Sequence, residues 1–218
     1  MKSEHSERLK KEFDHQVETL LQKGYPKLAG VSAAAFTKAL QPLRAKVTKS
    51  AVAEIKLDEG KLPFVIVIQS EWVSTEKALQ RVERKGKRGF LSMFPVKPES
   101  FEPIEGVKIP RSRAYLLLDV DRGKKTLNVA PDAALKMIKK TKRSPLTIDE
   151  GIAVLTHYPD FLKKNNCFSM LASRCGDRRV PALWLSAGRP KLGWCWAGNP
   201  HTWLGSASCG KRVGLLKK

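Results

Sequence analysis

Cationic and aromatic side chains gather in one part of the sequence, between residues 174 and 196. The set comprises Arg174, Arg178, Arg179, Arg189, Lys191, Trp194 and Trp196. Arginine binds phosphate oxygens through forked hydrogen bonds, lysine binds them as a point charge, and an indole face can stack on a nucleic-acid base. Residues 161–218 contain eleven Lys or Arg residues and a single acid, Asp177. The sequence therefore predicts a C-terminal surface that binds nucleic acid or another phosphorylated anion. In the alternative interpretation, the tryptophans fill the core of a small sheet that has few other large apolar residues.

A second group in the same segment could act on a small anionic substrate. Asp177 could orient His201, which could act as an acid or a base, and Arg174 could hold an oxyanion or a phosphate. Asn199 stands two residues before His201 in a predicted turn, and sites often lie on loops held by rigid strands. The competing interpretation is structural, because Asp177 could pair with the arginines that follow it and Asn199 could begin a turn.

The four cysteines also lie in this part of the chain and could ligate zinc. They are Cys167, Cys175, Cys195 and Cys209, with His201 as a substitute ligand. Tetrahedral thiolate sites need four ligands, but the intervals of seven, nineteen and thirteen residues contain no Cys-x-x-Cys pair. Cysteine is often simply a small buried hydrophobe. Zinc is therefore one hypothesis, and buried thiols are the other.

Hydrophobic periodicity predicts the elements that position these side chains. Apolar residues recur at helical spacing in residues 2–22 and again in 36–47, where Pro42 either kinks the second helix or restarts it. Short β-branched runs predict buried strands at 62–68 and 115–120. Further helices are expected after Ser74, running into the basic loop 84–89, and from Pro131 and Thr147. The chain divides into a helical segment 1–60, an α/β middle 61–160 and a basic, Trp- and Cys-rich β unit 161–218.

The C-terminal unit has strand-like segments at 180–186, 192–197 and 202–208, separated by turn sequences. They predict a three-stranded antiparallel β meander in which Trp194 and Trp196 share one face and Cys195 lies on the other. The basic loop 84–89 is expected to add at most accessory phosphate contacts. The predicted fold class is α+β, with N-terminal helices, central buried strands with helices, and the C-terminal antiparallel β meander packed against them.

Composition limits the classes of protein that the chain can be. A formal net charge of +20 over 218 residues favours polyanionic partners but does not identify one. The apolar runs are too short to cross a bilayer, and the first eleven residues alternate charges rather than form a signal peptide. The sequence therefore predicts a cytoplasmic protein with no membrane partner and with reduced thiols.

Two long C-terminal blocks resemble a known bacterial family, a domain of unknown function. Residues 176–186 read GDRRVPALWLS and residues 190–209 read PKLGWCWAGNPHTWLGSASC. The segments 115–121, 146–151 and 24–26 are similar to the same family. The resemblance covers most of the chain and implies that residues 1–218 form a single family unit. It implies no activity, because none is established for the family.

Three functional hypotheses follow from these observations. The first is a protein that binds nucleic acid or a phosphorylated anion, the second is an enzyme that uses Arg174, Asp177, Asn199 and His201, and the third is a partner-binding scaffold with structural tryptophans. A flat, exposed basic face would favour the first, whereas a deep pocket where His201 and Asp177 converge would favour the second.

Overall fold

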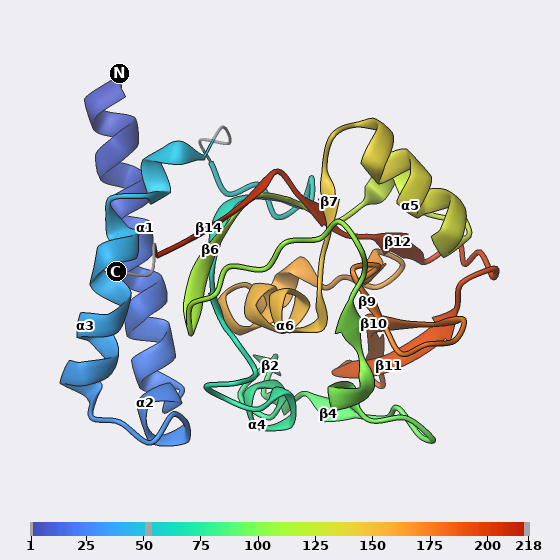
Figure 1. Ribbon diagram of the computed structural model, residues 1–218, viewed down its shortest axis with the longest axis horizontal. Coiled ribbons are helices and arrows are strands. Elements are labelled where there is room, and N and C mark those ends of the chain that lie inside the picture. Colours follow the sequence, from blue (N-terminus) through green and yellow to red (C-terminus); the bar gives the residue numbers. More distant parts are fainter. Residues whose placement is uncertain (1, 51–53, 216–218) are drawn as a thin grey trace.

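Helices form the N-terminal part of the chain, as the apolar spacing predicts. In a computed structural model that describes residues 2–50 and 54–215, α1 spans Lys2–Gln22 and α3 spans Ala33–Arg44, with α2 (Tyr25–Leu28) between them and η1 (Val47–Lys49) after them. Leu9 and Phe13 of α1 are buried, and the two long helices run side by side at one end of the molecule (Figure 1). Pro42 lies inside the last turn of α3.

The first sheet is built around β6 (Ala114–Asp121), which is buried from residue 114 to 118. Strand β1 (Lys61–Ile68) pairs antiparallel with one edge of β6. The other edge of β6 pairs with β14 (Lys211–Gly214) and β13 (Ser208–Cys209), and β13 also pairs with β7 (Ser144–Pro145). The two predicted buried strands are confirmed. Residues 208–214 complete this sheet, a pairing that the sequence pattern does not indicate.

The second sheet has the order β12-β8-β10-β11-β4. Its strands are β4 (Phe90–Leu91), β8 (Cys167–Ser169), β10 (Arg179–Ser186), β11 (Arg189–Trp196) and β12 (Leu204–Ser206). The β10–β11 hairpin is antiparallel, as predicted. The predicted meander is wrong in its third strand, because β4 occupies the free edge of β11 and β12 pairs in parallel with β8 beyond β10.

Helix α6 (Ile148–His157) lies between the two sheets (Figure 1). Its predicted capping box is present, since the Thr147 hydroxyl accepts the Glu150 N–H and the Glu150 carboxylate accepts the Thr147 N–H. Gly151 faces Met170, and a Cβ placed there would lie 2.1 Å from the Met170 sulfur. The helix therefore packs closely against the second sheet, and α5 (Pro131–Lys140) covers a smaller apolar cluster nearby.

The helix predicted after Ser74 is shorter than expected. It forms α4 (Thr75–Leu79), and the basic loop that follows is a small hairpin of β2 (Glu83–Arg84) and β3 (Lys87–Arg88). The chain turns back there, so that a Cβ at Gly89 would lie 2.7 Å from the Leu79 carbonyl oxygen. The remaining short elements are η2 (Pro98–Ser100), β5 (Glu102–Pro103), η3 (Lys124–Thr126), η4 (Pro159–Phe161) and β9 (Ser173–Arg174), with β5 paired to β9.

One apolar cluster joins the three segments of the chain, since Leu9, Leu118 and Leu183 all belong to it. The α+β class and the N-terminal helices are thus confirmed. Within residues 2–50 and 54–215, no helix combines the length and the apolar character needed to cross a bilayer.

Candidate functional site

The β10–β11 hairpin carries most of the predicted binding residues, and its pleat divides them between two faces. Arg179 lies directly opposite Trp196, and Trp194 shares their face. Leu183 and Leu192 on this face are fully buried. We call it the core face, and of its two tryptophans Trp194 is half-buried and Trp196 is exposed.

Trp184 and Lys191 form a cross-strand pair on the opposite face of the hairpin, which we call the outer face. Arg189 pairs with Ser186 on this same face, and Phe90 of β4 is aligned with Lys191. The predicted basic and aromatic surface is therefore two surfaces on opposite sides of one sheet.

Arg179 is already bound by its neighbours on the core face. Its guanidinium lies 4.7 Å from the Trp194 ring centroid and 5.1 Å from that of Trp196. It forms an ion pair with Asp177, whose carboxylate also accepts the Arg179 N–H at 2.7 Å. That backbone hydrogen bond is the largest cause that lowers the pKa of Asp177. The charge of Arg179 is therefore neutralised within the protein.

The other two predicted arginines of this region are also paired with an acid. Arg174 and Arg178 lie 3.9 and 3.8 Å from the carboxylate of Asp132, at the start of α5. The Arg174 side chain is only 19% exposed, whereas that of Arg178 is 71% exposed. An acid outside the C-terminal segment thus offsets part of the predicted basic patch, which makes this side a weaker anion site than the sequence predicts.

The outer face presents cations that lie on aromatic rings. The Lys191 ammonium is 5.0 Å from the Trp184 ring centroid and 5.9 Å from that of Phe90. The Arg189 guanidinium is 4.5 Å from the Phe90 ring centroid. Among the described residues, neither Lys191 nor Arg189 forms an ion pair with a carboxylate. Both charges therefore remain available to an external anion.

The β2–β3 hairpin lies beside these two cations and enlarges the charged area. Lys87 donates to the Ala187 carbonyl oxygen at 2.9 Å, and Arg189 donates to the Arg88 carbonyl oxygen at 3.2 Å. The resulting group, which we call the basic surface, comprises Lys85, Lys87, Arg88, Arg189 and Lys191. The predicted accessory loop is therefore contiguous with the C-terminal cations.

The Phe90 ring contacts two cations of this surface but is not among the candidates that the sequence analysis names. Its position directly after the basic loop is a signal that could have been used. Strand β4 pairs in parallel with β11, and this pairing brings the loop to Arg189. It joins residues about one hundred positions apart, so no local sequence pattern predicts it.

The predicted catalytic residues are not assembled into one pocket. Asp177 contacts Cys175 and Arg179, whereas the His201 ring stacks near Trp203 at 5.2 Å between centroids. Asn199 closes a turn through its N–H, which donates to the Trp196 carbonyl oxygen. In the described part of the chain, no hydrogen bond or ion pair links His201 to Asp177. The structural interpretation of these residues therefore agrees better with their contacts.

The cysteines are free thiols on separate segments of the chain, three on strands and Cys175 in the loop after β9. Cys167 and Cys209 are buried, and burial raises the pKa of Cys209 to about 12. Burial also raises the pKa values of Cys167, Cys175 and Cys195. No group of three or more His, Cys, Asp or Glu side chains is placed to hold a metal ion in residues 2–50 and 54–215. The zinc hypothesis thus has no support from the geometry of these ligands.

A cleft of about 830 Å³ lies away from the hairpin, between loops 69–75 and 98–113 and the start of α6. Its lining has both charge signs, with Glu71, Glu99 and Glu102 facing the same space as Arg111 and Arg113. Asp177 and His201 are not among the lining residues. The cleft has the size of a small-molecule site, but its mixed charges do not indicate an anionic ligand.

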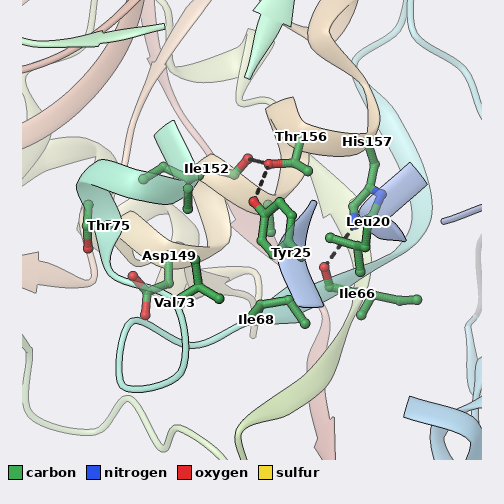
Figure 2. A pocket seen from close by; sticks show the side chains of 12 residues that line it. Leu20, Tyr25, Ile66, Ile68, Val73, Thr75, Asp149, Ile152, Thr156 and His157 are labelled. Carbon is green, nitrogen blue, oxygen red and sulfur yellow. Dashed lines mark hydrogen bonds between the residues drawn. The ribbon is translucent and has the colours of Figure 1, made fainter. Parts of the chain in front are cut away.

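A small interior pocket shares Thr75 and Asp149 with this cleft, and Figure 2 shows the residues that line it. It leaves about 10 Å³ of free volume, which is roughly the room that one water molecule needs. Burial raises the pKa of Asp149 and lowers that of His157 to about 3. The Tyr25 hydroxyl pairs with that of Thr156 at 3.1 Å. These groups are part of a packed interior rather than of an open site.

Comparison with known proteins gives one match. A family model described as "Family of unknown function (DUF5701)" matches residues 19–215, which is most of the chain. No curated protein and no solved structure match the sequence.

Proposed function

We propose that the chain, which belongs to the DUF5701 family of unknown function, is a cytoplasmic protein that binds nucleic acid through the basic surface. The main support is that two segments about one hundred residues apart bring five cations together. These are Lys85, Lys87, Arg88, Arg189 and Lys191. The four free thiols agree with a reducing compartment.

Among the described residues, only one ion pair with an acid involves a cation of this surface. Glu83 lies 4.0 Å from Arg88, and both side chains are largely exposed, so this ion pair is weak. Such a surface attracts a phosphate backbone because each bound cation releases a counterion from the nucleic acid. The arginines on the core face contribute less, since Asp132 and Asp177 already partner them.

Salt dependence tests this proposal directly. Five phosphate contacts predict a slope of log affinity against log salt of about −3.5 for a single strand, or roughly a 100-fold loss between about 50 and 200 mM salt. Fluorescence anisotropy of a labelled oligonucleotide measures it. Replacing Arg189 and Lys191 with glutamine should make the slope shallower by about 1.4.

The matched control removes two exposed lysines from α5, as Lys139→Gln with Lys140→Gln. Helix α5 packs on the Val180 end of the hairpin, away from the turn that carries Arg189. This double variant of α5 should keep the wild-type slope of log affinity against log salt. Equal effects of the two double variants, or binding that ignores salt, would contradict the proposal.

Another phosphorylated anion remains the competing ligand, and competition separates it from nucleic acid. Long-chain inorganic polyphosphate carries the charge without bases. We expect the oligonucleotide to bind more tightly than polyphosphate at equal phosphate concentration. If polyphosphate competes equally well, the ligand class is phosphorylated anions in general and the assignment to nucleic acid is wrong.

A further inference from the structure

Rings and cations follow one another along the outer face of the second sheet. The ring centroids of His201 and Trp203 are 5.2 Å apart, and those of Trp203 and Trp184 are 6.2 Å apart. Lys191 contacts both Trp184 and Phe90, and the Phe90 ring lies under Arg189. We call His201, Trp203, Trp184 and Phe90 the aromatic track. It leads without interruption into the basic surface.

The rings of the track are fixed in place but remain partly accessible. A Cβ at Gly193 would lie 2.3 Å from the Trp184 ring, so the absence of a side chain at Gly193 creates the space that this indole occupies. The indole packs on β11 at Gly193, and the Lys191 ammonium lies 5.0 Å from its ring centroid. Trp184, Trp203, Phe90 and His201 are all half-buried. A flat ligand could displace the Lys191 ammonium from the ring without disturbing the core.

The shape of this face does not suit binding to the major groove of a nucleic-acid duplex. The major groove of a duplex admits a helix or a two-stranded ribbon that projects from the protein. Helix α5 packs on Val180 at the far end of the sheet. The β2–β3 hairpin lies against the turn between β10 and β11. Hydrogen bonds from Lys87 and Arg189 join the two. In the described part of the chain, this face therefore offers rings for stacking, and neither α5 nor the β2–β3 hairpin is free to enter the major groove.

We infer that the nucleic acid bound by this protein is single-stranded, with bases stacked on Trp203 and Trp184 and phosphates at Lys191 and Arg189. The inference rests on the proposed function, because it specifies which nucleic acid the basic surface takes. Proteins that bind single strands combine such a cationic path with aromatic rings, and stacking tolerates any base because every base has a π face.

Titration of labelled single-stranded oligothymidine and of a duplex of equal length tests the inference. The single strand should bind at least 10-fold more tightly. Trp203→Leu should weaken single-strand binding by about 5-fold to 150-fold, the range expected for one lost stacking contact. Trp203→Phe, which keeps an aromatic ring, should retain most of the affinity. The melting temperature of each variant confirms that it is folded.

Trp196→Leu is the matched control, since Trp196 lies on the core face of the same hairpin and is 42% exposed. Its affinity should remain within about twofold of the wild type. Equal affinity for strand and duplex, or equal losses in Trp203→Leu and Trp196→Leu, would overturn the single-strand inference while leaving salt-dependent binding intact. Absence of salt-dependent binding to either form would overturn the proposed function as well.

Discussion

The Glu150–Arg212 ion pair is the most completely enclosed pair of charges among the described contacts. The carboxylate of Glu150 is fully buried, and the Arg212 side chain is 6% exposed. Glu150 accepts hydrogen bonds from Arg212 at 2.5 and 2.8 Å, from the Tyr115 hydroxyl at 2.8 Å and from the Thr147 N–H at 2.8 Å. Arg212 comes from β14 and Glu150 from α6, so the pair joins two distant parts of the chain.

Removing the cation should therefore be costly. Arg212→Met leaves a buried carboxylate without its counter-charge, and such a loss typically costs about 3–5 kcal/mol of unfolding free energy. Lys211→Met, on the exposed neighbouring position of the same strand, should change it by less than about 0.5 kcal/mol. Urea denaturation of both variants measures the difference. Similar midpoints would show that the ion pair contributes little.

His157 should make stability depend on pH. Burial, together with Lys23 and His15, lowers its pKa from 6.5 to about 3 in the folded protein. Between these two pH values the unfolded chain binds more protons, so stability falls as the pH drops below 6.5. At pH 5 the loss from this one group is about 2 kcal/mol.

His157→Gln tests this expectation, because a glutamine amide can still donate to the Ile66 carbonyl oxygen that the imidazole contacts at 3.1 Å. The wild type should lose more unfolding free energy than the variant between pH 7.5 and pH 5, as measured by urea denaturation. Parallel pH profiles for the two proteins would mean that His157 titrates normally.

At the scale of elements, one side chain closes the free edge of strand β1. Gln16 of α1 is fully buried, accepts the Ile66 N–H at 2.9 Å and donates to the Phe64 carbonyl oxygen at 3.3 Å. It also donates to the Tyr158 hydroxyl at 2.9 Å. The amide thus makes the hydrogen bonds that a neighbouring strand would make, which protects an otherwise open sheet edge.

Gln16→Leu should destabilise the folded protein, because it removes these hydrogen bonds. It leaves two buried backbone groups unpaired, at about 1–3 kcal/mol each, so we expect a loss of about 2–6 kcal/mol in unfolding free energy. The Ile66 amide should also exchange hydrogen faster. Gln22→Leu, on the exposed end of the same helix, should cost little. Unchanged exchange at Ile66 in Gln16→Leu would contradict this role.

Elements with local patterns could be predicted from the sequence, and elements made by distant pairing could not. The period of α1 and the capping box of α6 depend on residues within one or two turns, and the β10–β11 hairpin depends on the turn at Ala187 and Gly188. The pairings of β12 with β8, and of β4 with β11, depend on which edge remains free after the core has packed. The spacing of residues in the sequence does not indicate which strand will pair with which free edge.

At the scale of the whole molecule, the net charge of +20 is not distributed as the sequence predicts. Three of the predicted arginines are paired with Asp132 or Asp177, whereas Arg189 and Lys191 meet the basic loop on the outer face. The candidate residues could be found from composition, because composition records charge. Their division between two faces could not, since it requires the strand register and the position of an acid some forty residues earlier in the chain.

The central strand β6 lacks a full set of neighbours until residues 211–214 pair with it. About ninety residues separate the end of β6 from the start of β14, and a ribosome adding 5–20 residues per second needs on the order of 5 to 20 seconds to make them. During that interval the nascent chain has one side of β6 unpaired and the carboxyl of Glu150 without its guanidinium. The first sheet can therefore close only once residues 211–214 have been made, and growing chains that stall before residue 211 should be clients of chaperones.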